Sequence, residues 1–265
     1  MLWKFSLPLA LSGVLVGPVR WTCNAFLVNK PDGYSEMGIL TAGLVFQTLL
    51  LFVSNMLHAP LLSILCHTGD AKSKQLETVN ILISWILGLF PAIPLLCFPE
   101  IVELLFGGGY KGRTFRMTFA LIVFYTCILT FRSGLLRVLI SRSLNWWGLG
   151  NNLVWAVTVV PSAWYLSQWG AVGLAASFAI AYVSCSVFFM PVYMKQCNVP
   201  RYFLVSKEVA IVWLVLIVLV IMSFCHIPLL YRILVMPISF YLTGFALKTL
   251  WDRGTQVTGE NGERN

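Results

Sequence analysis

Long apolar runs separated by short polar segments dominate the chain. Eight runs are long enough to cross a bilayer as helices, at approximately residues 6–28, 37–65, 78–106, 115–141, 145–166, 170–193, 207–226 and 229–250. About 20 mostly apolar residues span the hydrocarbon core as a helix, whereas barrel strands are shorter and alternate apolar with polar positions. The pattern therefore predicts an all-α, polytopic integral membrane bundle of about eight transmembrane helices.

The short polar segments between the apolar runs indicate how the chain is divided and how it is oriented in the membrane. We predict a six-helix lobe at 1–195, two additional transmembrane helices at 196–251 and a frayed polar cytoplasmic tail at 252–265. With the N-terminus inside, eleven Lys and Arg fall on the cytoplasmic side and five on the outer side, with Arg20 and Arg132 set aside as intramembrane. Because Lys and Arg concentrate in cytoplasmic connections, this bias predicts that both termini are cytoplasmic.

Composition supports a membrane protein and argues against several other classes. Apolar residues make up 58% of the 265 positions and charged residues only 11%, against roughly 25% charged in soluble domains. The net charge is +8, and the basic residues lie between the apolar runs. This placement suits contact with an anionic leaflet of the lipid bilayer rather than with nucleic acid. The seven cysteines form no C-x-x-C pair and no His lies at ligand spacing from them, so we predict no metal site and no cofactor.

Four of the predicted spans carry polar side chains on one face. In a bilayer such faces are turned toward other helices or toward a wet cavity. The stripes are Arg20 and Asn24; Gln47, Asn55 and His58; Thr118, Tyr125 and Arg132; and Asn151, Trp155, Thr158 and Ser162. The candidate substrate-binding residues are Arg20, Asn24, Gln47, Asn55, Arg132, Asn151 and Trp155.

Three arginines within the spans have different predicted roles. Arg20 lies near mid-depth of the first span, where a guanidinium is costly unless it faces water or an anion. It is a candidate phosphate-binding group, or alternatively a structural group bonded to carbonyls freed at Pro18. Arg132 either joins Arg20 in a cationic cavity or extends to the membrane surface, whereas Arg137 is expected to extend to the cytoplasmic head groups.

Glu100 and Glu103 are the only paired carboxylates near a predicted membrane boundary. Two carboxylates three residues apart on a helix suit acid–base chemistry or cation binding. They also suit solvent exposure or ion pairs with the basic cluster at 111–116. We favour this second interpretation.

Four segments resemble parts of the polysaccharide flippases of the MOP exporter superfamily, the Wzx-type O-antigen transporters. These segments are FSLPLALSGVLVGPVRW (5–21), QTLLLFVSNMLHAPLLSIL (47–65), FPEIVELLFGGGY (98–110) and WGAVGLAASFAIAYV (169–183). The resemblance lies in the order and spacing of degenerate apolar motifs over residues 5–195. It implies the C-terminal one of two six-helix lobes, followed by an extra helix pair.

The resemblance also implies a function. Such transporters move polyprenyl-pyrophosphate-linked oligosaccharides across the bacterial inner membrane, from the cytoplasmic to the outer leaflet, by alternating access. Arg20 and Arg132 would then hold the pyrophosphate, and the polar stripes of the second and fifth spans would face the sugar. Since one lobe provides half a cavity, we expect a second lobe, from another copy of the chain or from a separately encoded one.

Two alternative functions remain open at this stage. The chain is either an inactive remnant or structural partner of a polysaccharide-assembly complex, or a lipid-using membrane enzyme. An enzyme of that kind needs clustered carboxylates or histidines in a large loop. The longest internal connection has about a dozen residues and holds no such cluster, so we predict a protein that is not an enzyme.

Overall fold

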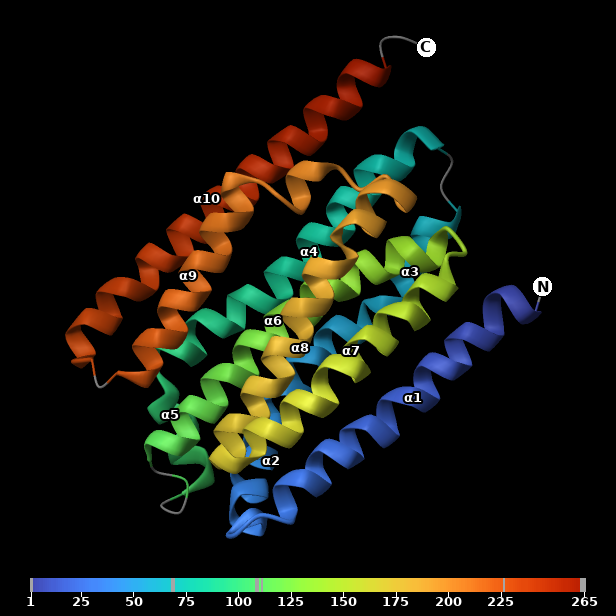
Figure 1. Ribbon diagram of the computed structural model, residues 1–265. Helices are drawn as coiled ribbons and strands as arrows, with labels where there is room; N and C mark the ends of the chain where they lie inside the picture. Colours follow the sequence, from blue (N-terminus) through green and yellow to red (C-terminus); the bar gives the residue numbers. More distant parts are fainter. Residues whose placement is uncertain (1, 68–69, 108–109, 111, 226, 263–265) are drawn as a thin grey trace.

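The computed structural model describes residues 2–67, 70–107, 110, 112–225 and 227–262, and no strand occurs among them. Long helices run side by side as one bundle, joined by short connections (Figure 1). The ten α-helices are α1 (Leu2–Val28), α2 (Gly33–Met56), α3 (His58–His67), α4 (Asp70–Cys97), α5 (Pro99–Phe106), α6 (Arg113–Ser141), α7 (Asn145–Leu166), α8 (Gly170–Gln196), α9 (Lys207–Phe224) and α10 (Leu229–Gly262).

Seven helical stretches of the described chain are long and apolar enough to cross a membrane. One of them, Asn145–Gln196, has 52 residues and contains both α7 and α8. The chain reverses between these helices at a short 3-10 turn, where Gly170 has a φ of 65° that favours glycine. The eight predicted spans correspond to α1, α2, α4 and α6 to α10, and the predicted polytopic helical bundle is confirmed.

Two predicted spans are each divided by a proline. The predicted helix over 37–65 ends at Met56, and α3 begins at His58. Pro60 has no N–H to donate to the Met56 carbonyl, so the regular helix stops there. Pro99 begins α5 in the same way, and Phe98 before it leaves the helical conformation with φ −129° and ψ 62°.

The helix α6 lies at the centre of the bundle and α1 at its margin (Figure 1). In the apolar 18-residue stretch of α6, 72% of the residues are buried, against 11% in α1. The last two helices share the core with this centre: Leu216 of α9 and Leu250 of α10 belong to the same buried cluster as Ile93 of α4 and Phe131 of α6. The two additional helices therefore pack into the same core as helices of the predicted lobe.

The end of α10 differs from the predicted frayed tail. The helix continues to Gly262, and Arg253 Nη2 lies 2.5 Å from Glu208 Oε1 at the start of α9. Gly254 is buried against Thr78, because a Cβ at this glycine would come within 2.7 Å of the Thr78 methyl group. These contacts with α9 and α4 fix the helix at residues 253 and 254, and the polar composition of 252–265 does not reveal them.

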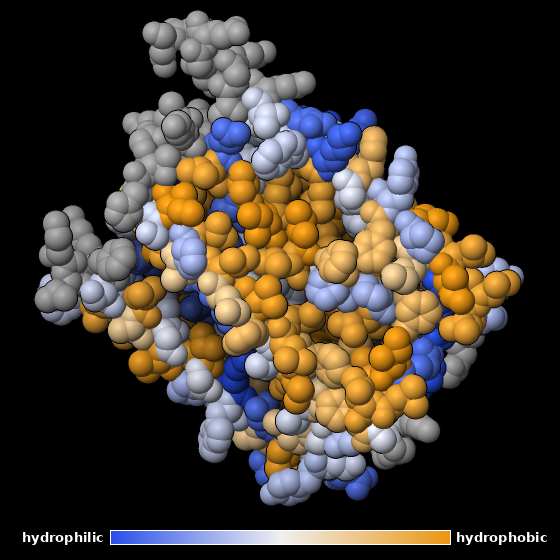
Figure 2. Space-filling view, turned by 180° about the vertical axis from the view of Figure 1, so that it is seen from behind, coloured by the Kyte–Doolittle hydropathy of each residue, from blue (hydrophilic) through white to orange (hydrophobic). Residues whose placement is uncertain are grey.

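The outer surface has the character expected of a membrane-embedded bundle. Large apolar side chains such as Trp3, Phe90 and Leu234 are exposed. Broad apolar areas cover the back face of the molecule, while hydrophilic residues gather toward its ends and along a recessed strip (Figure 2). Since α1 begins and α10 ends at the same end of the bundle (Figure 1), both termini lie on one side. That this side is cytoplasmic stays a prediction.

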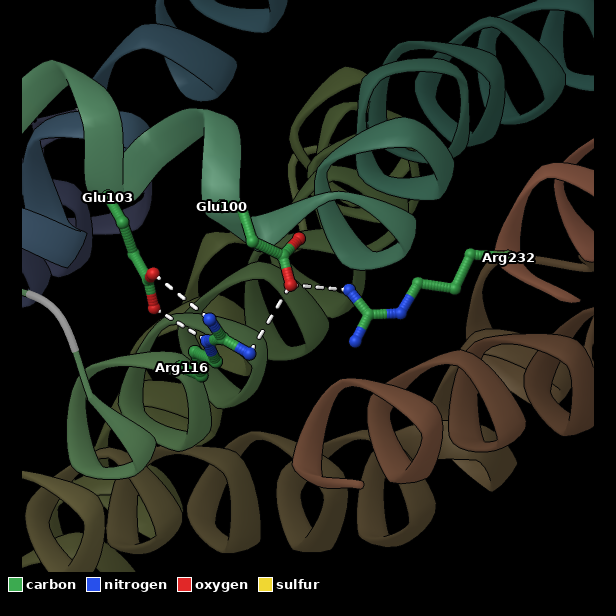
Figure 3. Close-up of polar contacts among 4 residues, drawn as sticks. All are labelled: Glu100, Glu103, Arg116 and Arg232. Carbon is green, nitrogen blue, oxygen red and sulfur yellow. Dashed lines mark hydrogen bonds and ion pairs between the residues drawn. The ribbon is translucent and has the colours of Figure 1, made fainter. Parts of the chain in front are cut away.

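An ion-pair network joins α5, α6 and α10 (Figure 3). It lies at the end of the bundle where α5 is found, opposite the two termini (Figure 1). Arg116 donates from Nε and Nη2 to the two carboxylate oxygens of Glu103, at 2.6 and 3.1 Å. Its Nη1 lies 3.3 Å from Glu100 Oε1, which also accepts from Arg232 Nη1 at 2.5 Å. Two carboxylates and two guanidiniums therefore neutralise one another, which is the ion-pair interpretation of Glu100 and Glu103.

The partners of these carboxylates were predicted only in part. Arg116 belongs to the basic cluster at 111–116, as expected, whereas Arg113 is exposed and Lys111 lies outside the described residues. Arg232 is 132 residues from Glu100 in the sequence, so spacing alone gave no indication of this contact.

We expect the network to make stability depend on acidic pH. Burial would raise the pKa of Glu100, but the hydrogen bond from Arg232 and the charges of Arg232 and Arg116 outweigh it and lower this pKa. A carboxylate with a lowered pKa stabilises the fold above its unfolded-state pKa of about 4.3, and this contribution is lost as pH falls through the lower folded-state value.

Thermal unfolding of the detergent-solubilised chain and of Glu100→Gln, measured from pH 7 to pH 3, tests this. The Tm difference between the two proteins should be largest near neutral pH and should shrink below about pH 4.3. A difference that stays constant down to pH 3 would contradict the role of this carboxylate.

Candidate functional site

A polar cavity of about 340 Å³ lies between α1, α2, α6, α7 and α8. Each of these helices contributes at least one polar side chain to its wall. Five of the seven candidate residues line it: Arg20, Asn55, Arg132, Asn151 and Trp155. The structure thus brings together residues from α1, α2, α6 and α7 that are far apart in the sequence.

Tyr182 of α8 connects the two arginines of this cavity. Arg20 Nη2 donates to the Tyr182 hydroxyl at 3.4 Å, and the guanidinium carbon of Arg132 lies 5.5 Å from the centre of the Tyr182 ring. A guanidinium at this distance from an aromatic face is attracted by the ring quadrupole. The guanidiniums of Arg20 and Arg132, which are far apart in the sequence, therefore contact the same aromatic side chain.

The cavity carries positive charge without a carboxylate beside it. None of the described residues that line it is acidic. The arginines of the described chain that form ion pairs with carboxylates are others, Arg116, Arg142, Arg232 and Arg253. An anion entering the cavity would meet two guanidiniums that are not already neutralised by contact with the protein's own acids.

Three buried polar atoms in the cavity wall find no hydrogen-bond partner among the described residues. They are Arg132 Nη1, Asn151 Oδ1 and Trp155 Nε1. A buried polar group left without a partner costs roughly 1–3 kcal/mol. Arg132, Asn151 and Trp155 also line the cavity, so a molecule in the cavity would lie beside these residues.

Stacked aromatic side chains hold the floor of the cavity in place. The Trp155 ring lies 5.8 Å from the Tyr182 ring with an angle of 23° between their planes. The rings of Tyr125 and Phe178 pack on the same pair. Tyr125, Trp155, Phe178 and Tyr182 are all buried, so the tyrosine that both arginines contact is packed among aromatic neighbours.

The geometry distinguishes between the alternatives for Arg20 and Arg132. The side-chain hydrogen bond of Arg20 goes to the Tyr182 hydroxyl of α8 rather than to a carbonyl of α1, and α1 continues through Pro18. Arg132 is only 9% exposed and shares the cavity with Arg20. It therefore joins Arg20 rather than extending to the membrane surface.

The candidates Asn24 and Gln47 lie away from this cavity. Neither belongs to its lining, and Gln47 is buried. Both share a helical face with a lining residue, but Asn24 is about 6 Å further along α1 than Arg20, and Gln47 is about 12 Å from Asn55 along α2, at 1.5 Å per residue. A helical wheel records angle and ignores depth, so it groups residues that a short cavity separates.

Several lining residues were missed in the sequence, namely Tyr182, Ser133, Asn145 and Asn152. A signal existed on α7, because Asn145, Gly148, Asn152 and Trp155 follow an i, i+3, i+7, i+10 pattern on one face. Tyr182 lies in a run of small and apolar residues that is typical of close helix packing, so its hydroxyl gave no comparable signal.

Arg137 contradicts its prediction. It is 1% exposed and lies between α4 and α6, where its Nε donates to Asn80 Oδ1 at 2.6 Å and its Nη2 donates to the Ser84 hydroxyl. Asn80 in turn donates to the Gly134 carbonyl at 2.8 Å. Asn80 and Ser84 are one turn apart on α4 and offer acceptors at the depth of Arg137, so the side chain bonds there instead of reaching the head groups.

Within the described part of the chain, no group of three His, Cys, Asp or Glu side chains is placed to hold a metal ion. No protein-family model, curated protein or solved structure matches the chain. The resemblance to O-antigen flippases therefore stays a prediction, and the chain is assigned here to the polytopic helical membrane proteins by its fold alone.

Proposed function

We propose that the chain is a component of a membrane transporter for a polyprenyl-pyrophosphate-linked oligosaccharide, such as an O-antigen or another surface polysaccharide unit. It would move this lipid between the leaflets of a bacterial inner membrane by alternating access. The observation that carries the proposal is the meeting of Arg20 and Arg132 at Tyr182, in a cavity whose described lining has no acidic side chain.

The two guanidiniums match the chemistry of a pyrophosphate group. Arginine presents a planar fork of N–H donors that fits phosphate oxygens, and it keeps its charge at any physiological pH. Arg132 lines the cavity and is in none of the ion pairs of the described chain, so a phosphate would not have to displace a carboxylate from it. In a cavity of low dielectric this attraction is stronger than it would be in water.

The remaining wall suits the first sugar of the cargo. Asn55 and Asn152 contribute amides, and the buried Trp155 ring supports this wall from behind. Small-ligand pockets typically enclose about 300–1,000 Å³, and 340 Å³ is near the lower limit. The cavity therefore has room for a pyrophosphate and one sugar rather than for a whole oligosaccharide.

A second lobe would provide the space that the rest of the oligosaccharide needs. The helix α1 forms one wall of the cavity and lies at the margin of the bundle (Figure 1), with Val14 and Trp21 exposed. A second copy of the chain, or a separately encoded lobe, packed along this margin would enlarge the cavity without disturbing the core around α6.

Binding to a defined lipid tests the proposal. The full chain in nanodiscs should bind a polyprenyl-pyrophosphate sugar at least about ten-fold more tightly than the uncharged polyprenol of equal length. Equal affinities for the two lipids would overturn the proposal, because the apolar surface alone would then account for binding.

Rescue of a cell lacking its own flippase extends the test to transport. Restored surface polysaccharide with the chain alone would support a second copy as the other lobe, and rescue only with a co-expressed lobe would support a separate chain. Translocation in neither case, measured where the protein is shown to be in the membrane, would contradict a role in transport.

A further inference from the structure

A second cavity, of about 410 Å³, lies between α4 and α10. Its wall is almost entirely apolar, with Ile83, Ile86 and Phe90 from α4 and Phe240 and Leu247 from α10. Phe90 is 67% exposed and Ile86 47% exposed, so this groove is open to the outside of the bundle. At membrane depth the medium outside consists of lipid chains, and an open apolar groove there is filled by a chain rather than by water.

Gly244 leaves space in the groove. It lies on α10 among the lining residues, and a Cβ built on it would meet no atom within 4 Å. Glycine inside a helix weakens it by roughly 1 kcal/mol relative to alanine, and its φ gives no reason for glycine here. The open space beside Gly244 is therefore a property of the groove and not of a close helix contact.

One end of the groove is polar. Lys248 and Trp251 line it there, and α10 runs antiparallel to α4, because Arg232 contacts Glu100 and Gly254 packs on Thr78. In the span Leu229–Thr255, Lys248 lies about 9 Å from the middle at 1.5 Å per residue. A lysine side chain extends from there to the head-group level, about 15 Å from the bilayer centre.

The charge at this end has no acidic neighbour in the groove. None of the described lining residues is an Asp or a Glu. Asp252, one turn further along α10, does not line the groove, and Glu208 is paired with Arg253. Tryptophan is enriched where head groups meet the hydrocarbon, so Trp251 marks the same depth as the Lys248 ammonium group.

We propose that this groove binds one anionic glycerophospholipid, with an acyl chain between α4 and α10 and its phosphate bonded to Lys248. The apolar wall favours an acyl chain, the open space at Gly244 accommodates that acyl chain, and the lysine favours a negatively charged head group. The site is separate from the cationic cavity, and it holds whether or not the chain transports a pyrophosphate lipid.

Retention of defined lipids by the full chain tests this site. The protein is exchanged into nanodiscs of phosphatidylcholine and phosphatidylglycerol, extracted in mild detergent, and its bound lipids are counted by native mass spectrometry. The unchanged chain should retain one phosphatidylglycerol in preference to phosphatidylcholine. No retained lipid, or no preference between the two, would overturn the proposal.

Two groove variants separate the acyl chain from the head group. Gly244→Leu places a side chain in the open space, where its Cβ meets no protein atom within 4 Å, and should lower retention of both lipids at least about ten-fold. Lys248→Gln should keep a bound lipid but lose the preference for phosphatidylglycerol. Gly13→Leu, on α1 with equally open surroundings, and Lys207→Gln, an exposed lysine at the same end of the bundle, are the matched controls.

The comparison with the control variants distinguishes lipid bound in this groove from lipid held non-specifically around the whole protein. Retention by Gly244→Leu equal to that of Gly13→Leu would contradict binding in the groove, and an unchanged preference in Lys248→Gln would contradict the head-group contact. Ile86→Trp fills the same groove from α4 and must reproduce the loss, with an unchanged Tm as evidence that each variant is folded.

Discussion

Replacement of Arg132 by alanine is expected to weaken binding of a polyprenyl-pyrophosphate sugar by about 10- to 150-fold, since a hydrogen bond to a charged group contributes about 1.5–3 kcal/mol. Arg20→Ala should produce a loss within the same range. Both arginines line the cavity, and no described acidic lining residue competes for them. The measurement is equilibrium binding of the labelled lipid to the full chain in nanodiscs, with the uncharged polyprenol as reference.

Arg201→Ala is the matched control, because Arg201 is exposed and lies outside the cavity lining. Arg132→Lys should recover only part of the affinity, since an ammonium group cannot present two parallel N–H donors to a phosphate. Equal losses in Arg132→Ala and Arg201→Ala would mean that net charge, rather than this cavity, attracts the lipid.

Tyr182 provides a further distinction between the two arginine contacts. Tyr182→Phe removes the acceptor of Arg20 Nη2 but keeps the ring under Arg132. Tyr182→Phe should therefore reproduce the part of the affinity loss of Arg20→Ala that comes from mispositioning Arg20, and it should leave Arg132 in place. Tyr182→Leu removes both contacts and should weaken binding further, so identical affinities for these two variants would contradict the positioning role of the ring.

The bundle could be predicted from the sequence because the bilayer sets the length of each span. Apolar runs of sufficient length must be helices there, since every backbone N–H needs a partner within the segment. What the runs did not reveal is where a proline ends a helix inside an apolar stretch, as Pro60 does between α2 and α3. A hydropathy profile does not register the backbone N–H that a proline lacks.

The candidate site could be predicted only in part, for a reason of geometry. The polar stripes of α6 and α7 contain buried side chains such as Arg132 and Asn151, whereas Arg20 on α1 lines the same cavity but is exposed. Depth along the helices could not be read from the stripes, because it depends on how the helices are shifted against each other. The role of Tyr182 arises only when α8 packs beside α6 and brings its hydroxyl to Arg20.

The error over Arg137 has the same origin and leads to a prediction about stability. An arginine near a span end extends to the head groups only if the protein offers nothing better, and here α4 offers Asn80 Oδ1 and the Ser84 hydroxyl. Gly134 allows this approach, since a Cβ on it would lie 3.1 Å from the Ser84 Cβ. The helices α4 and α6 thus pack around the buried guanidinium of Arg137. This contact cannot be predicted from the sequence of either helix alone.

Arg137→Ala is expected to lower the free energy of unfolding by about 2–5 kcal/mol, because it leaves a cavity in the core and two buried groups without their donor. The measurement is reversible unfolding of the detergent-solubilised chain, followed by its helix content. Binding of the pyrophosphate lipid by the folded fraction should be unchanged, since Arg137 does not line the cationic cavity.

A double variant shows whether the charge or only the packing is needed. Arg137→Met fills much of the same volume but leaves Asn80 Oδ1 unpartnered. Arg137→Met combined with Asn80→Leu removes the guanidinium together with this acceptor, and the Ser84 hydroxyl keeps its bond to the backbone carbonyl of residue 80. Since buried polar pairs replaced by apolar side chains are often as stable as before, the double variant should recover most of the stability lost in Arg137→Ala. Full stability in Arg137→Ala with weakened lipid binding would contradict this arrangement, and would place Arg137 in the transport path instead of the α4–α6 contact.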